Sequence, residues 1–134
     1  MTSFQLKIVT PDGLEYDGQA EELVVRTTTG DVGILANHTN LVAPLGMGRA
    51  TIVVEGKKRF AACIGGMVSV VGGAVTLVPT TFEWAESIDA MRAEAAQQRA
   101  EDALRRKDAS DTEIKLAQAK LHRALVRKNV ASYK

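Results

Sequence analysis

Several residue types are scarce in this chain of 134 residues, and each scarcity excludes a class of protein. Cys63 is the single cysteine, which excludes an intramolecular disulfide or a thiolate metal cluster and favours a reducing compartment. Aromatic residues make up 4% of the chain, too few for the stacking surfaces of single-strand nucleic-acid binders. No segment approaches the roughly 20 apolar residues of a membrane-spanning helix. We therefore expect neither nucleic-acid binding nor direct membrane insertion.

Glycine and proline are absent after Pro79, although the first 79 residues hold all eleven glycines and all three prolines. Both residue types are common in turns and costly inside helices. The distribution predicts a turn-rich β domain over residues 1–84 and a helical region over residues 85–134. The expected fold class is α+β: an N-terminal antiparallel β-sandwich followed by a C-terminal antiparallel two-helix hairpin.

Short segments in the first part alternate between apolar and polar residues, which is the period of a half-buried strand. Glycine pairs at 65–66 and 72–73 predict tight hairpins between successive strands. The residues from Gly30 to His38 are expected to form a loop. The strands expected are residues 4–8, 22–27, 49–55, 59–64, 67–71 and 74–78.

The second part carries two helix-start signals. Ser87 followed by Asp89 predicts a helix that begins near residue 88 and ends near residue 107. The segment from Ser110 to Glu113 matches a capping box and predicts the start of a second helix. Small residues dominate the expected interface, so the hairpin should be weakly held. The interface residues expected are Met91, Ala95, Ala103, Leu104, Ile114, Ala117, Leu121, Ala124 and Leu125.

Four arginines of the expected hairpin allow two interpretations. An antiparallel pair with its turn near residue 109 would place Arg92 beside Arg123 and Arg127, with Arg99 about one turn away and Asp89 close by. They are either solvated charges that point apart, or a cluster that binds a polyphosphate through charge-assisted hydrogen bonds. Spacing alone leaves both interpretations open.

Acidic residues are absent from Ile114 to Lys134, where six lysines and arginines occur. A basic segment of this kind suits an anionic partner or a solvated surface. The chain also lacks the glycine-rich phosphate loops and the nucleophile elbow of common enzymes. Cys63 is expected to be a buried inert thiol, and His38 has no metal-ligand neighbours at suitable spacing. The sequence therefore predicts no catalytic residue and no metal ligand.

Several separated motifs occur in an order that closely resembles the epsilon subunit of bacterial and chloroplast F-type ATP synthases. They are Thr10-Pro11-Asp12-Gly13, the segment from Gly30 to Leu35 followed by His38, and Leu41-Val42-Ala43-Pro44-Leu45, with the helical hairpin after them. The resemblance covers essentially the whole chain. It implies a non-catalytic regulatory subunit of the rotary, proton-translocating synthase, peripheral at the cytoplasmic face of the cell membrane.

The same resemblance implies partners for each part of the chain. The sandwich would bind the gamma subunit and the ring of c subunits, with partner contacts at Gly33, Ile34, Leu35 and His38. The hairpin would reach the catalytic head of alpha and beta subunits and inhibit ATP hydrolysis there. A free-standing ATP-sensing adaptor that never joins a rotor is the alternative.

The segment from Ile88 to Ala93 is similar to a nucleotide motif of the family's bacillus members, written Ile or Leu, Asp, two variable residues, Arg, Ala. The resemblance implies ATP as a regulatory ligand and leaves the role of magnesium open. His122 beside Arg123 allows another register for the second helix. By resemblance, Glu83, Ile88, Asp89 and Ala93 would lie near adenine and ribose, and Arg92, Arg99, Arg123 and Arg127 on the phosphates.

Overall fold

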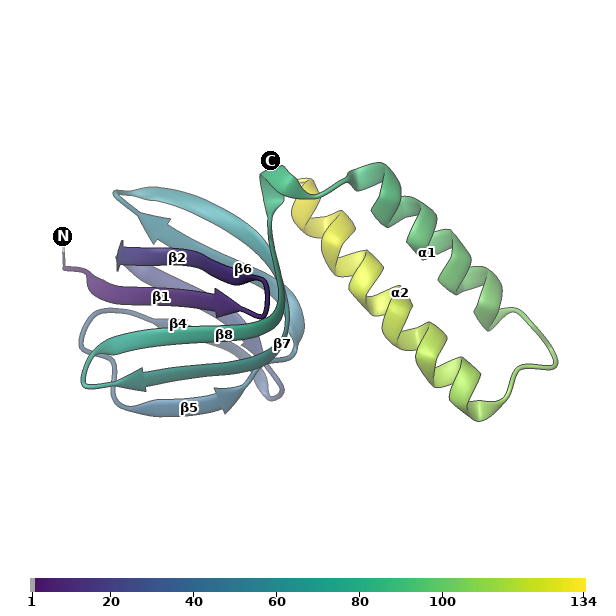
Figure 1. Cartoon of the computed structure of the whole chain (residues 1–134), viewed down its shortest axis with the longest axis horizontal. Coiled ribbons are helices and arrows are strands. Elements are labelled where there is room, and N and C mark those ends of the chain that lie inside the picture. The colour runs from purple at the N-terminus through teal and green to yellow at the C-terminus, as the bar shows by residue number, and fades with distance from the viewer. Residues whose placement is uncertain (1) are drawn as a thin grey trace. The chain divides into compact units, whose positions relative to one another are not determined.

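The computed structural model describes residues 2–134, which form two compact units (Figure 1). The first unit ends at Trp84 and contains the strands. The second unit, Ala85–Lys134, contains the helices.

The strands of the first unit form one continuous sheet that encloses its own core (Figure 1). Hydrogen-bonded neighbours follow the order β2-β1-β8-β7-β6-β3-β4, and β5 pairs with β7. Among the described strands every pairing is antiparallel except the parallel pair β1 and β8. The predicted β-sandwich followed by a helical hairpin is confirmed. The strands are β1 (Phe4–Thr10), β2 (Gly13–Ala20), β3 (Glu22–Thr27), β4 (Gly30–Ile34), β5 (Leu41–Pro44), β6 (Met47–Val54), β7 (Lys57–Val71) and β8 (Ala74–Trp84).

The core of the sandwich follows from the alternation of side chains along each strand. In β1, Phe4, Leu6 and Ile8 are buried, whereas Gln5 and Lys7 are exposed. Successive side chains of a strand point to opposite faces, so one face of β1 is apolar and faces the interior. Large residues from β3, β4, β6, β7 and β8 complete this core, and they are Leu23, Val25, Ile34, Ile52, Val68, Val70, Val75 and Leu77.

The glycine pair in β7 does not form the hairpin that the sequence predicts. Gly65 and Gly66 have φ values of 69° and 98°, and they lie inside one uninterrupted strand. The strand pairs with β6 as far as Ile64 and with β5 from Met67 onward. The prediction of a turn is wrong because the positive φ values bend the strand as it changes partners and do not reverse it.

Three strands were missing from the sequence-based expectation, namely β2, β4 and β5. Much of β2 is exposed, and it pairs only with β1 in the described sheet, so its sequence carries little apolar alternation. The segment Gly30–Ile34, expected in a loop, pairs with β3 as an edge strand. Edge strands bury little area, and their sequences therefore resemble loops.

The second unit consists of a short 3₁₀ turn, η1 (Ala85–Ser87), and two helices, α1 (Ala90–Leu104) and α2 (Asp111–Ala131). Asp89, and not Ser87, caps α1, because its carboxylate accepts a hydrogen bond of 3.0 Å from the Arg92 N–H. Ser110 caps α2 by accepting from the Glu113 N–H, which confirms the predicted capping box.

The end of α1 differs from the expectation, since it lies at Leu104 and not near residue 107. Residues 105–110 contain neither glycine nor proline, so no residue there marks the end of the helix clearly. Across residues 2–134, neither helix has the length and apolar character needed to cross a bilayer.

We expect Gly66→Ala to destabilise the sandwich by at least about 3 kcal/mol. A Cβ atom at this position would lie 2.0 Å from the Val78 carbonyl oxygen, and the φ of 98° is unfavourable for alanine. Gly33→Ala is the matched control, because nothing lies within 4 Å of its Cβ position and its φ is ordinary. Urea unfolding followed by circular dichroism measures both variants. Equal stability of the two would contradict the assignment of Gly66 as a close-packed bend.

Candidate functional site

Alanines spaced seven residues apart form the contact between the two helices. Ala93 and Ala100 of α1 are buried, as are Ala117, Ala124 and Ala131 of α2. Seven residues are nearly two helical turns, so each set lies along one face. Because alanine side chains are small, the two helix backbones can approach closely along this alanine seam.

The expected interface is partly wrong. Ala117 and Ala124 are buried as predicted, but Met91 is 84% exposed and Leu125 is 43% exposed, and Ala95 is exposed as well. Apolar residues at three- and four-residue steps led to a predicted face that includes the larger side chains. The observed face is the one on which alanines repeat, because the closest approach of the backbones is possible there.

Lys128 joins the two helices and shows how they are aligned. Its ammonium lies 2.6 Å from the Glu94 carboxylate and donates a hydrogen bond of 3.2 Å to the Gln97 side-chain oxygen. This alignment places Arg99 opposite the stretch of α2 that carries Arg123 and Arg127. Arg92 does not line the same depression as Arg99, Arg123 and Arg127, and its predicted place beside Arg123 and Arg127 stays a prediction.

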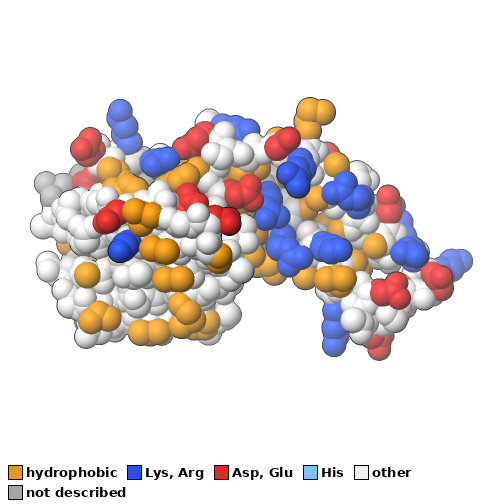
Figure 2. Space-filling model, viewed as in Figure 1, with side chains coloured by type: hydrophobic (Ala, Val, Ile, Leu, Met, Phe, Trp, Pro, Cys, Tyr) orange, Lys and Arg blue, Asp and Glu red, His pale blue; other side chains and the backbone are white. Residues whose placement is uncertain are grey.

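A basic groove of about 450 Å³ runs along one flank of the alanine seam. Arg123 and Arg127 are half-buried at its wall and Arg99 is exposed, while Lys and Arg side chains spread over this unit in Figure 2. Glu113 is the one carboxylate in the lining, against four cationic side chains. The residues that line the basic groove are Ala96, Arg99, Ala100, Ala103, Glu113, Leu116, Ala117, Lys120, Arg123, Ala124 and Arg127.

The two flanks of the hairpin therefore differ in charge balance. On one flank Lys128 is neutralised by Glu94. On the other flank Arg99 and Arg123 form no ion pair with any of residues 2–134. Like charges on one wall repel each other, and a bound polyanion would convert that repulsion into charge-assisted hydrogen bonds. The groove is chemically suited to a chain of phosphates.

The nucleotide-motif residues lie at the start of α1. Asp89 caps the helix, and Ile88 and Ala93 are buried, with 2% and 5% of their surfaces exposed. The Ile88 carbonyl accepts a hydrogen bond of 2.5 Å from the Lys134 ammonium, which ties the end of the chain to the motif. The side chain of Arg92 is exposed and lies outside the lining of the basic groove.

Glu83 belongs to the first unit, where it lies in β8 opposite Ala62 of β7. It is half-buried. That Glu83 contacts a nucleotide stays a prediction. The same holds for the motif residues and the arginines.

The predicted partner residues lie at the end of β4 and in the loop after it. Gly33 is exposed and Leu35 is 58% exposed, so both are accessible on this surface. Ile34 is fully buried in the core, and it can therefore position its neighbours but offers no side chain to a partner. The His38 ring nitrogen Nδ1 lies 2.7 Å from the Thr39 carbonyl oxygen.

An exposed apolar surface on β5, β7 and β8 escaped the sequence reasoning. Met67 and Val78 are paired across β7 and β8, and both are more than 40% exposed, while Val42 and Val71 are more than 60% exposed. Hydrophobic side chains gather over this part of the sheet in Figure 2. The segment 67–71 could have predicted this surface, because its apolar residues occupy both faces of the strand. Apolar side chains exposed side by side commonly mark a protein contact.

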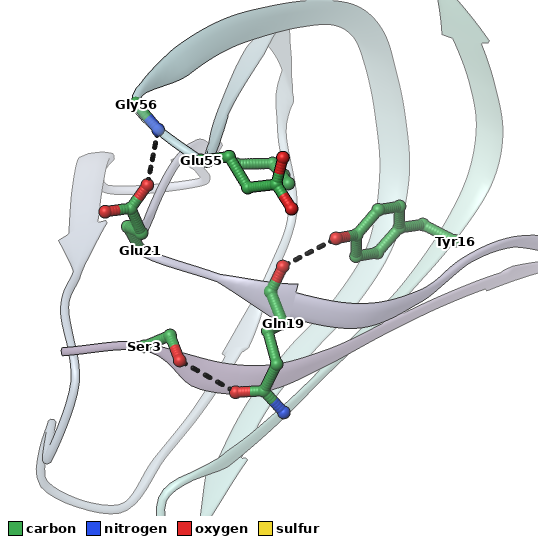
Figure 3. Close-up of a pocket in the computed structure, with 7 residues that line it drawn as sticks. Ser3, Tyr16, Gln19, Glu21, Glu55 and Gly56 are labelled. Atoms are coloured by element: carbon green, nitrogen blue, oxygen red, sulfur yellow. Dashed lines mark hydrogen bonds between the residues drawn. The ribbon is translucent and has the colours of Figure 1, made fainter. Parts of the chain in front are cut away.

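A second cavity, of about 560 Å³, lies in the sandwich beside β2 and the turn between β6 and β7 (Figure 3). Its polar groups bond mainly to one another: Tyr16 donates to the Gln19 carbonyl at 2.6 Å, and Glu21 accepts from the Gly56 N–H at 2.6 Å. No group of three or more potential metal ligands occurs in residues 2–134. The first bond lies within β2 and the second holds the turn, so neither points to a ligand.

Cys63 is buried in the sandwich core, as expected for an inert thiol. Its burial disfavours the thiolate and raises the pKa of the thiol to about 12. The side chain is therefore protonated near neutral pH and has neither the charge nor the access for nucleophilic chemistry.

Comparison with known proteins gives matches along nearly the whole chain. Residues 3–85 match the family described as ATP synthase, Delta/Epsilon chain, beta-sandwich domain. Residues 86–132 match the ATP synthase, Delta/Epsilon chain, long alpha-helix domain. The boundary between the two matches falls beside the boundary between the two units of the structure.

Relatives of similar length carry the name ATP synthase epsilon chain. The one from Bacillus velezensis is 43% identical over 131 residues, which cover 98% of each chain. The one from Shouchella clausii is 40% identical over 134 residues, which cover 100% of this chain and 98% of that protein.

A solved structure supports the fold at lower identity. A chain of the Euglena gracilis mitochondrial ATP synthase, in a structure that contains OSCP, F1 and the c-ring, aligns with a TM-score of 0.85. The alignment covers all of this chain and 83% of that one at 20% identity. The two chains therefore share the same fold.

We expect a double-mutant cycle on Glu94 and Lys128 to give a coupling of about 0.3–1 kcal/mol, because the two side chains are about half exposed and water screens their attraction. Glu94→Gln and Lys128→Gln should each lower the free energy of unfolding. The loss in the double variant should be smaller than the sum of the two single losses. Urea unfolding followed by far-ultraviolet circular dichroism supplies the free energies. Strict additivity would show that this ion pair does not set the alignment.

Proposed function

The chain belongs to the ATP synthase delta/epsilon chain family, as an epsilon chain of the bacterial type, and from this membership we propose that it is a non-catalytic subunit of the synthase's rotary central stalk. Its fold is similar to that of chains in solved stalk and c-ring assemblies. The basic groove supports a binding role, because its lining offers cations and alanines but no nucleophile beside a base.

The β-sandwich is proposed to hold the chain in the complex by contacting the gamma subunit and the c-ring. The exposed apolar surface of Val42, Met67, Val71 and Val78 supports one such protein contact, and the exposed Leu35 after β4 supports another. Such contacts would place the chain peripherally on the membrane-bound complex, at its cytoplasmic face.

The helical hairpin is proposed to bind ATP as a regulatory ligand. The observation that carries this proposal is the basic groove, in which Arg99, Arg123 and Arg127 line one depression beside a seam of small residues. Phosphate oxygens accept charge-assisted hydrogen bonds from guanidinium groups, often in bidentate pairs. The similarity of Ile88–Ala93 to a nucleotide motif supports the same ligand.

The hairpin is further proposed to change state with ATP. Alanine contacts bury little apolar area, so the compact hairpin can be released without large cost. The released α2, which carries no acid after Glu113, would meet an acidic surface of the catalytic head and hinder ATP hydrolysis. A ligand that binds only the compact form favours it by about 2.7 kcal/mol at 100 times its dissociation constant.

We expect the isolated protein to bind ATP without hydrolysing it, and Arg123→Ala to weaken binding about 30-fold through the loss of about 2 kcal/mol of phosphate contacts. Isothermal titration calorimetry measures both affinities. Arg106→Ala is the matched control, since Arg106 lies in the exposed connection between the helices and outside the groove. Equal affinities for all three proteins would remove the basic groove from nucleotide binding. Arg92→Ala, measured in parallel, shows whether the ligand reaches the start of α1.

We expect deletion from Ile88 onward to raise ATP hydrolysis by a reconstituted synthase at low ATP, because the inhibitory helix is then missing. The shortened chain should still be recovered with gamma, because the sandwich has a core of its own. Hydrolysis rates are compared for complexes with full-length and shortened chains at low and high ATP. Equal rates would contradict inhibition by the hairpin, and failure of the full-length chain to assemble with gamma, alpha and beta would favour a free-standing adaptor.

A further inference from the structure

Lys120 lines the basic groove together with the three arginines, although no motif in the sequence points to it. It lies three residues before Arg123 and seven before Arg127, so the three side chains follow one face of α2. The stripe from Lys120 to Arg127 is about 10 Å long at the rise of an α-helix. An elongated stripe of cations matches a chain of phosphates better than a single small anion.

The local sequence leaves Lys120 without an acid of its own helix at pairing distance. The positions three and four residues away hold Leu116, Ala117, Arg123 and Ala124, and none of them is acidic. Glu113, two turns earlier, already accepts from the Ser110 hydroxyl at the helix cap. The ammonium is therefore available to an anion in the groove.

The charge of the groove also depends on Lys120. Arg99, Arg123 and Arg127 against Glu113 give a formal charge of +2, and Lys120 raises it to +3. The fully ionised polyphosphate of a nucleotide carries three or four negative charges. Lys120 brings the site closer to charge balance, which is the condition under which a partly desolvated polyanion is held.

We propose that Lys120 is a phosphate-binding residue of the hairpin, which contacts the polyphosphate chain of the nucleotide alongside Arg99, Arg123 and Arg127. This inference rests on the proposed function of the groove and adds a fourth cation to it. Lysine binds phosphate as a strongly hydrated point charge, so its contribution is more sensitive to salt than that of a bidentate arginine.

The test is calorimetric titration of the full chain with ATP and, separately, with inorganic tripolyphosphate, at low and at moderate salt. Lys120→Ala should weaken both ligands roughly fivefold at low salt, and its affinity should depend less steeply on salt than that of the original chain. Lys120→Arg should restore most of the loss. Lys107→Ala is the charge-matched control, because Lys107 lies in the connection between the helices and does not line the groove.

The outcomes separate this inference from the proposed function. If Arg123→Ala loses binding while Lys120→Ala matches Lys107→Ala, the groove binds the nucleotide and Lys120 takes no part. If Lys120→Ala weakens ATP but not tripolyphosphate, the side chain does not contact phosphate and the inference is overturned. If neither ligand binds the original chain, the inference and the proposed nucleotide site fall together. Far-ultraviolet circular dichroism of each variant confirms that the helices remain folded.

Discussion

Close packing of alanines along one seam is the constraint on which the helical unit depends. Ala100 and Ala124 are almost completely buried, and their small side chains let the helix axes approach in a way that larger residues would prevent. The position of the alanine seam also determines which side chains flank the contact between the helices. The residues on either side of the alanines form two flanks. One flank carries the Glu94–Lys128 pair, and the other carries the basic groove. Packing geometry thus produces the charge asymmetry from which the function is inferred.

The weakness of the alanine seam and the charge of the basic groove both affect the proposed equilibrium between the compact and the released hairpin. Alanines bury little area, and the polar contacts of Lys128 and Lys134 add to the preference for the compact hairpin. Exposed polar contacts contribute little each. A hairpin built in this way has a small free-energy difference between states, and a ligand of ordinary affinity is sufficient to shift it.

The sequence allowed the parts of the fold that depend on local chemistry to be predicted. Alternation in β1 and the capping box at Ser110 each depend on a few neighbouring residues, and both predictions are confirmed. The bend at Gly65 and Gly66 was misread because a positive φ serves a turn and a kink equally well, and only the partner strands distinguish them. The alignment of the two helices is seen in the contacts of Lys128 with Glu94 and Gln97, which residue spacing alone does not predict. Predicting which arginines meet therefore required knowledge of the packing face.

The bend in β7 has a mechanical consequence. One strand supplies hydrogen bonds to β6 on one side of the bend and to β5 on the other, while β8 follows it along both stretches. The two stretches of β7 are joined covalently through the bend, so a displacement of the part that pairs with β5 is passed directly to the part that pairs with β6. The bend therefore ties two parts of the sheet into one body, which suits the rotary stalk position proposed for this chain.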